Sequence, residues 1–191
     1  MEQELALKIV GGVIVVGGAI ITYFLRVYGK KKELKIQHED EDLKKIQEFN
    51  LNVKKAYDAV NNDADNEFNI CQNVSKDYPR EDGIIFQNKI KELEKIIQYA
   101  DPCIDEMVKN TFNGILDDMA KYHSNLCLIN VLDRQSKGYQ NTNAPYGTQA
   151  YQAAATQNVK NIDSAANALM DCGNLKNHWR SLYQNIANKL N

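Results

Sequence analysis

The most apolar stretch of the chain runs from Ile9 to Leu25, 17 residues without a charge. A helix needs about 20 apolar residues to cross a bilayer, and the usable range begins near 17. Lys8 and Arg26 stand at its two ends, where their long side chains can reach the headgroups. The pattern therefore predicts a transmembrane helix within residues 1–28. A buried helix of a soluble domain and a signal peptide are the alternatives, the latter disfavoured by glutamates where a basic segment should stand.

Small residues recur along this apolar run. Gly11 and Gly18 are seven residues apart, as are Gly12 and Ala19, so all four share one side of a helix. Helices in lipid associate where small residues allow close approach. We expect this side to pack against other transmembrane helices, although glycines that a span merely tolerates explain the pattern equally simply.

A seven-residue repeat follows the apolar run. Its a and d positions include Ile36, Leu43, Ile46, Val53, Tyr57, Val60, Ala64, Cys71, Val74 and Tyr78. The register continues through the polar stretch NNDADN, which predicts an unbroken helix from 34 to 78, about 65 Å long. The helix should end at Tyr78, because Pro79 disfavours helical geometry in the residue before it. We divide it into a basic juxtamembrane segment and stalk over 29–56 and the first part of a bundle that fills 57–191.

Further helical stripes follow in the bundle. The second helix should bury Phe86, Ile90, Leu93, Ile97 and Ala100, and the third Ile104, Val108, Phe112, Ile115, Met119, Tyr122, Leu126 and Ile129. Between them, Asp101 should cap the third helix and Pro102 should occupy its first turn. We expect that helix to end near Gln135, ahead of an irregular linker over 136–147.

The last part of the chain predicts two more helices. The first should bury Tyr151, Ala155, Val159, Ile162, Ala166 and Leu169, and the second Leu175, Trp179, Leu182, Ile186 and Leu190. Gly173 should separate them as a C-cap. The expected fold class is all-α: one N-terminal transmembrane helix, a long stalk helix and an antiparallel helical bundle.

The charges beside the apolar run predict on which side of the membrane the bundle lies. The formal net charge is −2, which argues against a nucleic-acid partner. Arg26 and four lysines within 30–35 follow the apolar run, whereas only Lys8 precedes it closely. Since cations beside a span stay on the cytoplasmic or matrix side, the bundle should lie there. The basic segment should also touch lipid headgroups.

The four cysteines predict no metal-binding motif by spacing alone. In the reducing compartment that this sidedness implies, they should be buried thiols. In an oxidising compartment, helix lengths favour a disulfide between Cys71 and Cys172, with Cys127 left free.

Candidate chemistry is sparse. His123 and Cys127 share a helix face, and Cys172 and His178 flank the last predicted helix junction, which makes these four weak candidates for a zinc site. No phosphate loop, nucleophile elbow or zinc-protease motif occurs in the sequence. We therefore expect no enzyme, no cofactor and no small-molecule substrate.

The leading functional hypothesis is a non-catalytic, single-pass accessory or assembly subunit of a larger inner-membrane complex, bacterial or mitochondrial. Its partners would be the lipid bilayer and other membrane subunits, bound through the span and the bundle. Abundant Asn and scarce Arg are typical of AT-rich genomes, so a respiratory or ATP-synthase complex of an AT-rich protist is one candidate. The alternatives are a free-standing bacterial or phage membrane protein with an interaction or sensing bundle, and a metal-binding helical bundle.

Overall fold

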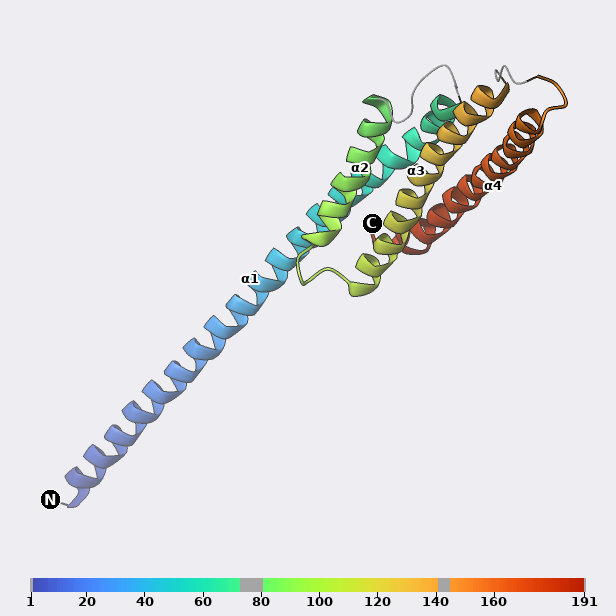
Figure 1. Cartoon of the computed structure of the whole chain (residues 1–191). Helices are drawn as coiled ribbons and strands as arrows, with labels where there is room; N and C mark the ends of the chain where they lie inside the picture. Colours follow the sequence, from blue (N-terminus) through green and yellow to red (C-terminus); the bar gives the residue numbers. More distant parts are fainter. Residues whose placement is uncertain (1, 73–80, 141–144, 191) are drawn as a thin grey trace. The chain divides into compact units, whose positions relative to one another are not determined.

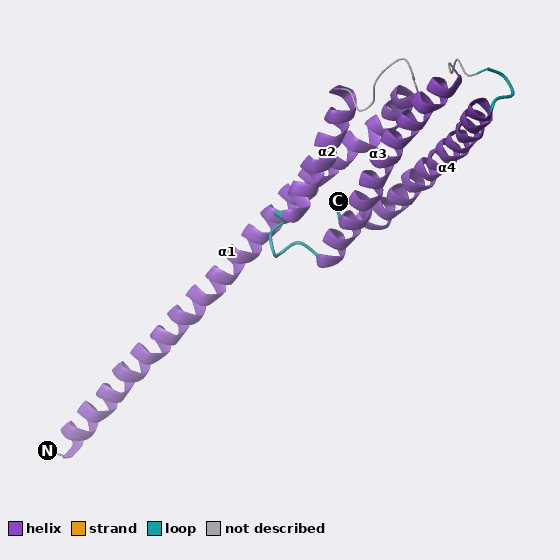
Figure 2. Cartoon of the chain, in the orientation of Figure 1, coloured by secondary structure: helices purple, strands orange, loops and turns teal. Residues whose placement is uncertain are grey.

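The chain is helical throughout the part that the structure describes. The computed structural model describes the backbone of residues 2–72, 81–140 and 145–190, and the side chains of 23–71, 83–138 and 145–190. Its elements are α1 (Glu2–Gln72), α2 (Glu81–Gln98), α3 (Glu106–Gln140), α4 (Gln149–Ile186) and a short 3-10 helix, η1 (Ala187–Lys189). Figure 2 shows no strand in these ranges. The predicted all-α class is confirmed.

The chain forms two compact units, Met1–Lys45 and Ile46–Asn191. In the first unit, every side chain described, from Tyr23 to Lys45, is exposed. The second unit holds the entire hydrophobic core. Because Phe49 and Val53 are buried in that core, it takes in residues that we had assigned to the stalk over 29–56.

The second unit is an up-down-up-down four-helix bundle, in which side-chain contacts fix the direction of each helix (Figure 1). Tyr122 and Asn130 of α3 donate hydrogen bonds to Ala64 and Cys71 of α1, so these two helices run parallel. Asn161 and His178 of α4 contact Gln135 and Asp118 of α3, and so α4 runs antiparallel to α3. Lys89 of α2 pairs with Asp63 of α1.

The repeat in α1 continues through its polar middle, as predicted. The buried residues on this helix include Phe49, Val53, Ala56, Tyr57, Val60, Ala64, Glu67 and Cys71. The helix is unbroken across NNDADN because Ala64 fills the a position while its polar neighbours face outward or reach other helices. The end predicted at Tyr78 lies outside the described residues, since α1 is described only as far as Gln72.

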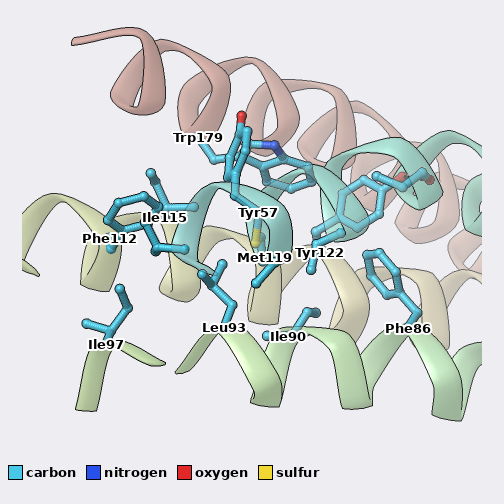
Figure 3. Close-up of a cluster of buried hydrophobic side chains, with 14 of the residues drawn as sticks. Tyr57, Phe86, Ile90, Leu93, Ile97, Phe112, Ile115, Met119, Tyr122 and Trp179 are labelled. Carbon is cyan, nitrogen blue, oxygen red and sulfur yellow. Dashed lines mark hydrogen bonds between the residues drawn. The ribbon is translucent and has the colours of Figure 1, made fainter. Parts of the chain in front are cut away.

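The predicted stripes of α2 and α3 form the centre of the core. Figure 3 shows their side chains converging with Tyr57 of α1 and Trp179 of α4. The labelled residues from these two helices are Phe86, Ile90, Leu93, Ile97, Phe112, Ile115, Met119 and Tyr122. All of them are buried, which confirms the predicted faces. Aromatic contacts join the layers, with the Tyr122 and Trp179 rings 5.1 Å apart at 80°.

The start of α3 differs from the prediction. Asp101 does not cap this helix; its Oδ1 accepts a hydrogen bond from the Cys103 amide in the preceding turn, at 3.1 Å. Asp105 supplies the cap instead, accepting from the Met107 amide at 2.8 Å, and the helix begins at Glu106. Asp101 and Asp105 can each accept a hydrogen bond from the amide two residues ahead, so local chemistry allows a helix to start after either one. The burial of Ile104 between them favours the later start.

The linker between α3 and α4 is shorter than predicted. The helix continues to Gln140, beyond the predicted end near Gln135, and buries Ser136. Thr148 caps α4 by accepting from the Tyr151 amide at 3.3 Å. Gly147 before it has φ of 81°, which glycine adopts at no steric cost.

The predicted break at Gly173 was wrong. One helix, α4, runs from Gln149 to Ile186, and Gly173 lies inside it with ordinary helical geometry. Its buried and half-buried core positions are Asn161, Ala165, Ala168, Cys172, Leu175, Trp179, Leu182 and Ile186, which alternate steps of four and three residues. Because this register passes Gly173 unchanged, packing on both sides holds the helix straight.

The predicted buried stripe in the first half of α4 was also wrong. The residues expected to face the core, from Ala155 to Leu169, are exposed in the structure. The helix buries Asn161, Ala165 and Ala168 instead. Small side chains let two helix axes approach closely, so α4 lies near α3 at the cost of leaving larger apolar groups outside.

The predicted membrane span is not supported by the structure. Among the residues whose side chains are described, no helix combines the length and apolar character needed to cross a bilayer. The predicted span, Ile9–Leu25, lies outside those residues except for its last three positions.

Candidate interaction surface

One side of α4 presents exposed apolar residues that the core does not use. It consists of Ala155, Val159, Ile162, Ala166, Leu169 and Met170, and we refer to it as the outer face of α4. Val159 is 57% exposed, Ile162 51% and Met170 68%. Single exposed apolar residues are ordinary on protein surfaces, but a run along one side of a helix is typical of a binding surface.

A groove between α3 and α4 borders this face. Ile129 and Asp133 of α3 line one wall, and Ile162, Ala165, Ala166 and Leu169 of α4 line the other. The groove is apolar except for one carboxyl group. Burial raises the pKa of Asp133, and the nearby Lys137 opposes the shift. An apolar groove with one acidic group suits an amphipathic helix that carries a cation.

Polar contacts hold α4 in the orientation that exposes this face. The Asn161 amide donates to Gln135 Oε1 at 3.4 Å and accepts from Gln157 at 2.9 Å. Further along, Asp118 Oδ2 lies 2.6 Å from His178 Nδ1. The contacts to Gln135 and Asp118 join α4 to α3, so rotating α4 to bury its outer face would break them.

Contacts with α1 fix the other half of α4. The Asn61 side chain accepts from both Trp179 Nε1 at 3.3 Å and Arg180 Nε at 2.8 Å. Asp65 pairs with Lys176 and Arg180, and these cations lower its pKa. The aspartates of the NNDADN stretch thus connect helices, since Asp63 pairs with Lys89 of α2.

The four candidate zinc ligands do not come together. Cys127 Sγ and His123 Nε2 are 3.9 Å apart on α3, whereas His178 contacts Asp118. The thiol of Cys172 lies near the Tyr122 carbonyl in the core. Among the described residues, no group of three or more His, Cys, Asp and Glu side chains is arranged to hold a metal ion.

Burial affects the protonation of the two cysteines and of His123 among these candidates. Zinc binds cysteine as the thiolate. Burial raises the pKa of Cys127, raises that of Cys172 to about 11, and lowers that of His123. The raised thiol pKa values oppose zinc binding, whereas the neutral imidazole is already the form that zinc binds.

None of the four cysteines forms a disulfide in the structure. Cys71 and Cys172 are both buried in the core cluster, and burial followed by the nearby Cys172 raises the pKa of Cys71 to about 12. Their nearness is compatible with the pairing predicted for an oxidising compartment, which stays a prediction. Cys103 and Cys127 are half-buried.

The predicted packing face in the apolar run is Gly11, Gly12, Gly18 and Ala19. These residues lie outside those whose side chains the structure describes. The packing face stays a prediction from sequence.

Sequence reasoning missed the groove and the contact between Asp118 and His178. The signal for the groove was present, because alternating steps of four and three residues connect Asn161 with Ile186 on α4. Asn161 and the alanines made that stripe less apolar than its neighbour. The contact between Asp118 and His178 depends on helix register, which no local pattern encodes.

Comparison with protein-family models, curated proteins and solved structures gave no match.

Proposed function

We propose that this protein is a membrane-anchored, non-catalytic interaction protein, an accessory or assembly subunit of a larger inner-membrane complex. The observation that carries the proposal is the outer face of α4, with Val159, Ile162 and Met170 each more than half exposed. This part of α4 turns larger apolar side chains to the solvent and alanines to the core. A partner that covers the outer face would remove that apolar surface from water, which is favourable.

The partner that best fits the groove is a helix of another protein. Ile129, Ile162 and Leu169 offer an apolar track on two neighbouring helices. Amphipathic helices bind such tracks through residues spaced one turn apart. A Lys or Arg on that helix would pair with Asp133, whose carboxylate is costly to bury alone.

The anchor in this proposal is the apolar run Ile9–Leu25. Its support is the sequence: 17 residues without a charge, with Lys8 before it and Arg26 after it. The excess of cations after the run favours the cytoplasmic or matrix side for the bundle. The anchor would hold the groove close to membrane-embedded partners and raise their effective concentration.

The test of the binding surface uses two double variants of the full chain. In Val159→Gln/Ile162→Gln the outer face of α4 becomes polar. In Ile84→Gln/Ile85→Gln the same change is made on α2, where the two side chains are equally exposed, at 51% and 50%. Membranes are solubilised in mild detergent and separated on a native gel, and the co-migrating chains are identified by mass spectrometry.

We expect the wild-type chain and the α2 variant to migrate with a large assembly, and the α4 variant to migrate alone. Urea unfolding of all three should agree, because none of the four side chains belongs to the core. Wild-type protein that migrates alone would contradict the proposal, as would an α4 variant that stays in the assembly. Release of the intact wild-type chain by a carbonate wash would contradict the anchor.

A further inference from the structure

The segment of α1 that follows the predicted anchor presents an unusual set of exposed side chains. Arg26, Lys30, Lys31, Lys32 and Lys35 are all exposed. Three aromatic residues precede or accompany them, with Tyr23 66%, Phe24 65% and Tyr28 75% exposed. We refer to these eight residues as the collar.

The collar surrounds the helix. Consecutive residues of an α-helix are rotated by about 100°, so Lys30, Lys31 and Lys32 project to three different sides. Lys35 adds a cation almost opposite Arg26 by the same geometry. A helix that lies along a membrane surface keeps its cations on one side and its apolar groups on the other. Cations on all sides instead fit a helix that passes through the headgroup layer.

The order of charges along the helix adds a direction. Glu33 is the only acidic residue between Tyr23 and Lys35. The acidic cluster of residues 39–42 comes next, and Glu39 already pairs with Lys35 across one helical turn, at 3.7 Å. From Arg26 to Lys35 the helix rises about 14 Å, roughly twice the depth of one headgroup layer, so its cations extend through that layer into the adjoining water.

Aromatic side chains complete the match to a lipid interface. Tyr and Trp prefer the boundary between headgroups and hydrocarbon, where a ring contacts acyl chains and a polar group contacts water. Tyr23 and Phe24 lie at the end of the apolar run, and Tyr28 lies one turn further, next to the lysines. Tyr23 and Phe24 thus precede all five cations and Tyr28 precedes the four lysines, which is the order that a bilayer interface favours.

We propose that the collar binds the headgroups of anionic phospholipids, with α1 crossing the headgroup layer instead of lying along it. This inference rests on the proposed membrane anchor and adds the chemical class of lipid. Phosphate groups of anionic lipids complement five cations, and the attraction decreases as salt screens it. The acidic cluster beyond residue 38 would be repelled by the same surface, which keeps the collar at a fixed depth.

The experiment uses the full chain reconstituted in vesicles of phosphatidylcholine mixed with phosphatidylglycerol. The vesicles are floated on a density gradient, the protein is purified in mild detergent, and the two lipids that remain bound are quantified. The collar variant is Lys30→Gln/Lys31→Gln/Lys32→Gln/Lys35→Gln. The control changes four other exposed lysines of α1 in the same way: Lys44→Gln/Lys45→Gln/Lys54→Gln/Lys55→Gln.

We expect wild-type and control proteins to retain phosphatidylglycerol several-fold above its share in the vesicles, and the collar variant to retain the two lipids in their bulk ratio. High salt during purification should reduce the wild-type enrichment. Wild-type protein that floats but retains the bulk ratio would overturn the collar and leave the anchor standing. A wild-type chain that does not float with vesicles would overturn the anchor and the collar together.

Discussion

Two buried side chains of α3 show how single residues connect the helices. The Tyr122 hydroxyl donates to the Ala64 carbonyl at 2.6 Å, and the Asn130 amide donates to the Cys71 carbonyl at 3.2 Å. The Asn130 amide thus gives a buried carbonyl of α1 a hydrogen-bond partner on a second helix. Both bonds hold α3 in one register along α1.

Several buried acids in this core predict how stability depends on pH. Burial raises the pKa of Tyr57 from 10.0 to about 12 and that of the Cys71 thiol from 9.0 to about 12. The Cys172 thiol shifts from 9.0 to about 11 for the same reason. In each case the folded state holds the proton more tightly than the unfolded chain does. The stability this provides is complete below about pH 9 and is lost as the pH rises towards 12.

We expect the free energy of unfolding to fall by on the order of a few kcal/mol between pH 9 and pH 11. Urea unfolding at a series of pH values, under reducing conditions, measures it. The variant Cys71→Ala should be less stable at pH 8 because it leaves a cavity, but its stability should fall less steeply with pH. A free energy of unfolding that stays constant up to pH 11 in the wild-type protein would contradict the raised pKa values of the buried thiols and tyrosine.

At the scale of elements, α4 illustrates how packing overrides a local signal. The sequence predicts a helix end at Gly173. The helix nevertheless continues through this residue because Cys172 and Trp179, on either side of it, are buried in the core. A methyl group added at Gly173 would meet nothing within 4 Å. The glycine therefore weakens the helix without a compensating contact.

The variant Gly173→Ala should raise the free energy of unfolding by about 0.5–1 kcal/mol, because alanine loses less backbone entropy in a helix. Gly147→Ala, at the glycine with φ of 81°, should have the opposite effect because a side chain is strained there. Thermal or urea unfolding of both variants gives the comparison. If Gly173 were a left-handed cap, its replacement would destabilise the protein as well.

At the scale of the whole molecule, the boundary between the two compact units makes a prediction about independent folding. The unit 46–191 contains the complete core cluster. Its last residues close the bundle, since Leu190 is buried and Asn50 Nδ2 donates to the Lys189 carbonyl at 3.4 Å. Lys189 also pairs with Asp105 at the start of α3, 2.6 Å away.

A chain of residues 46–191 should therefore fold cooperatively, with the same urea midpoint as residues 26–191. A chain of residues 57–191, which begins where the sequence alone placed the bundle, should lose several kcal/mol because Phe49 and Val53 are missing. Circular dichroism during urea titration compares the three. Equal midpoints for 46–191 and 57–191 would contradict the core as described.

The parts of the fold that could be predicted are those that a local hydrophobic pattern encodes. The stripes of α2 and α3 are strongly apolar and face one dense core, so counting positions was enough to find them. The continuous helix through NNDADN could be predicted because the repeat kept its phase. The cap at Asp105 could not be placed because Asp101 offers the same local hydrogen bond, and the four candidate metal ligands could not be placed because their positions depend on contacts between helices.

The sequence by itself determined the all-α class and the buried faces of α2, α3 and the bundle part of α1, since period and hydropathy agree there. Only the tertiary structure decided which side of α4 is buried. That helix offers two sides with helical spacing, and hydropathy favours the one from Ala155 to Leu169. The side with Asn161 and the alanines is buried because its small side-chain volume and the polar partners of α4 on α3 and α1 outweigh the apolar area left exposed. Volume complementarity arises only between elements distant in sequence, and it leaves α4 with the face that we propose a partner covers.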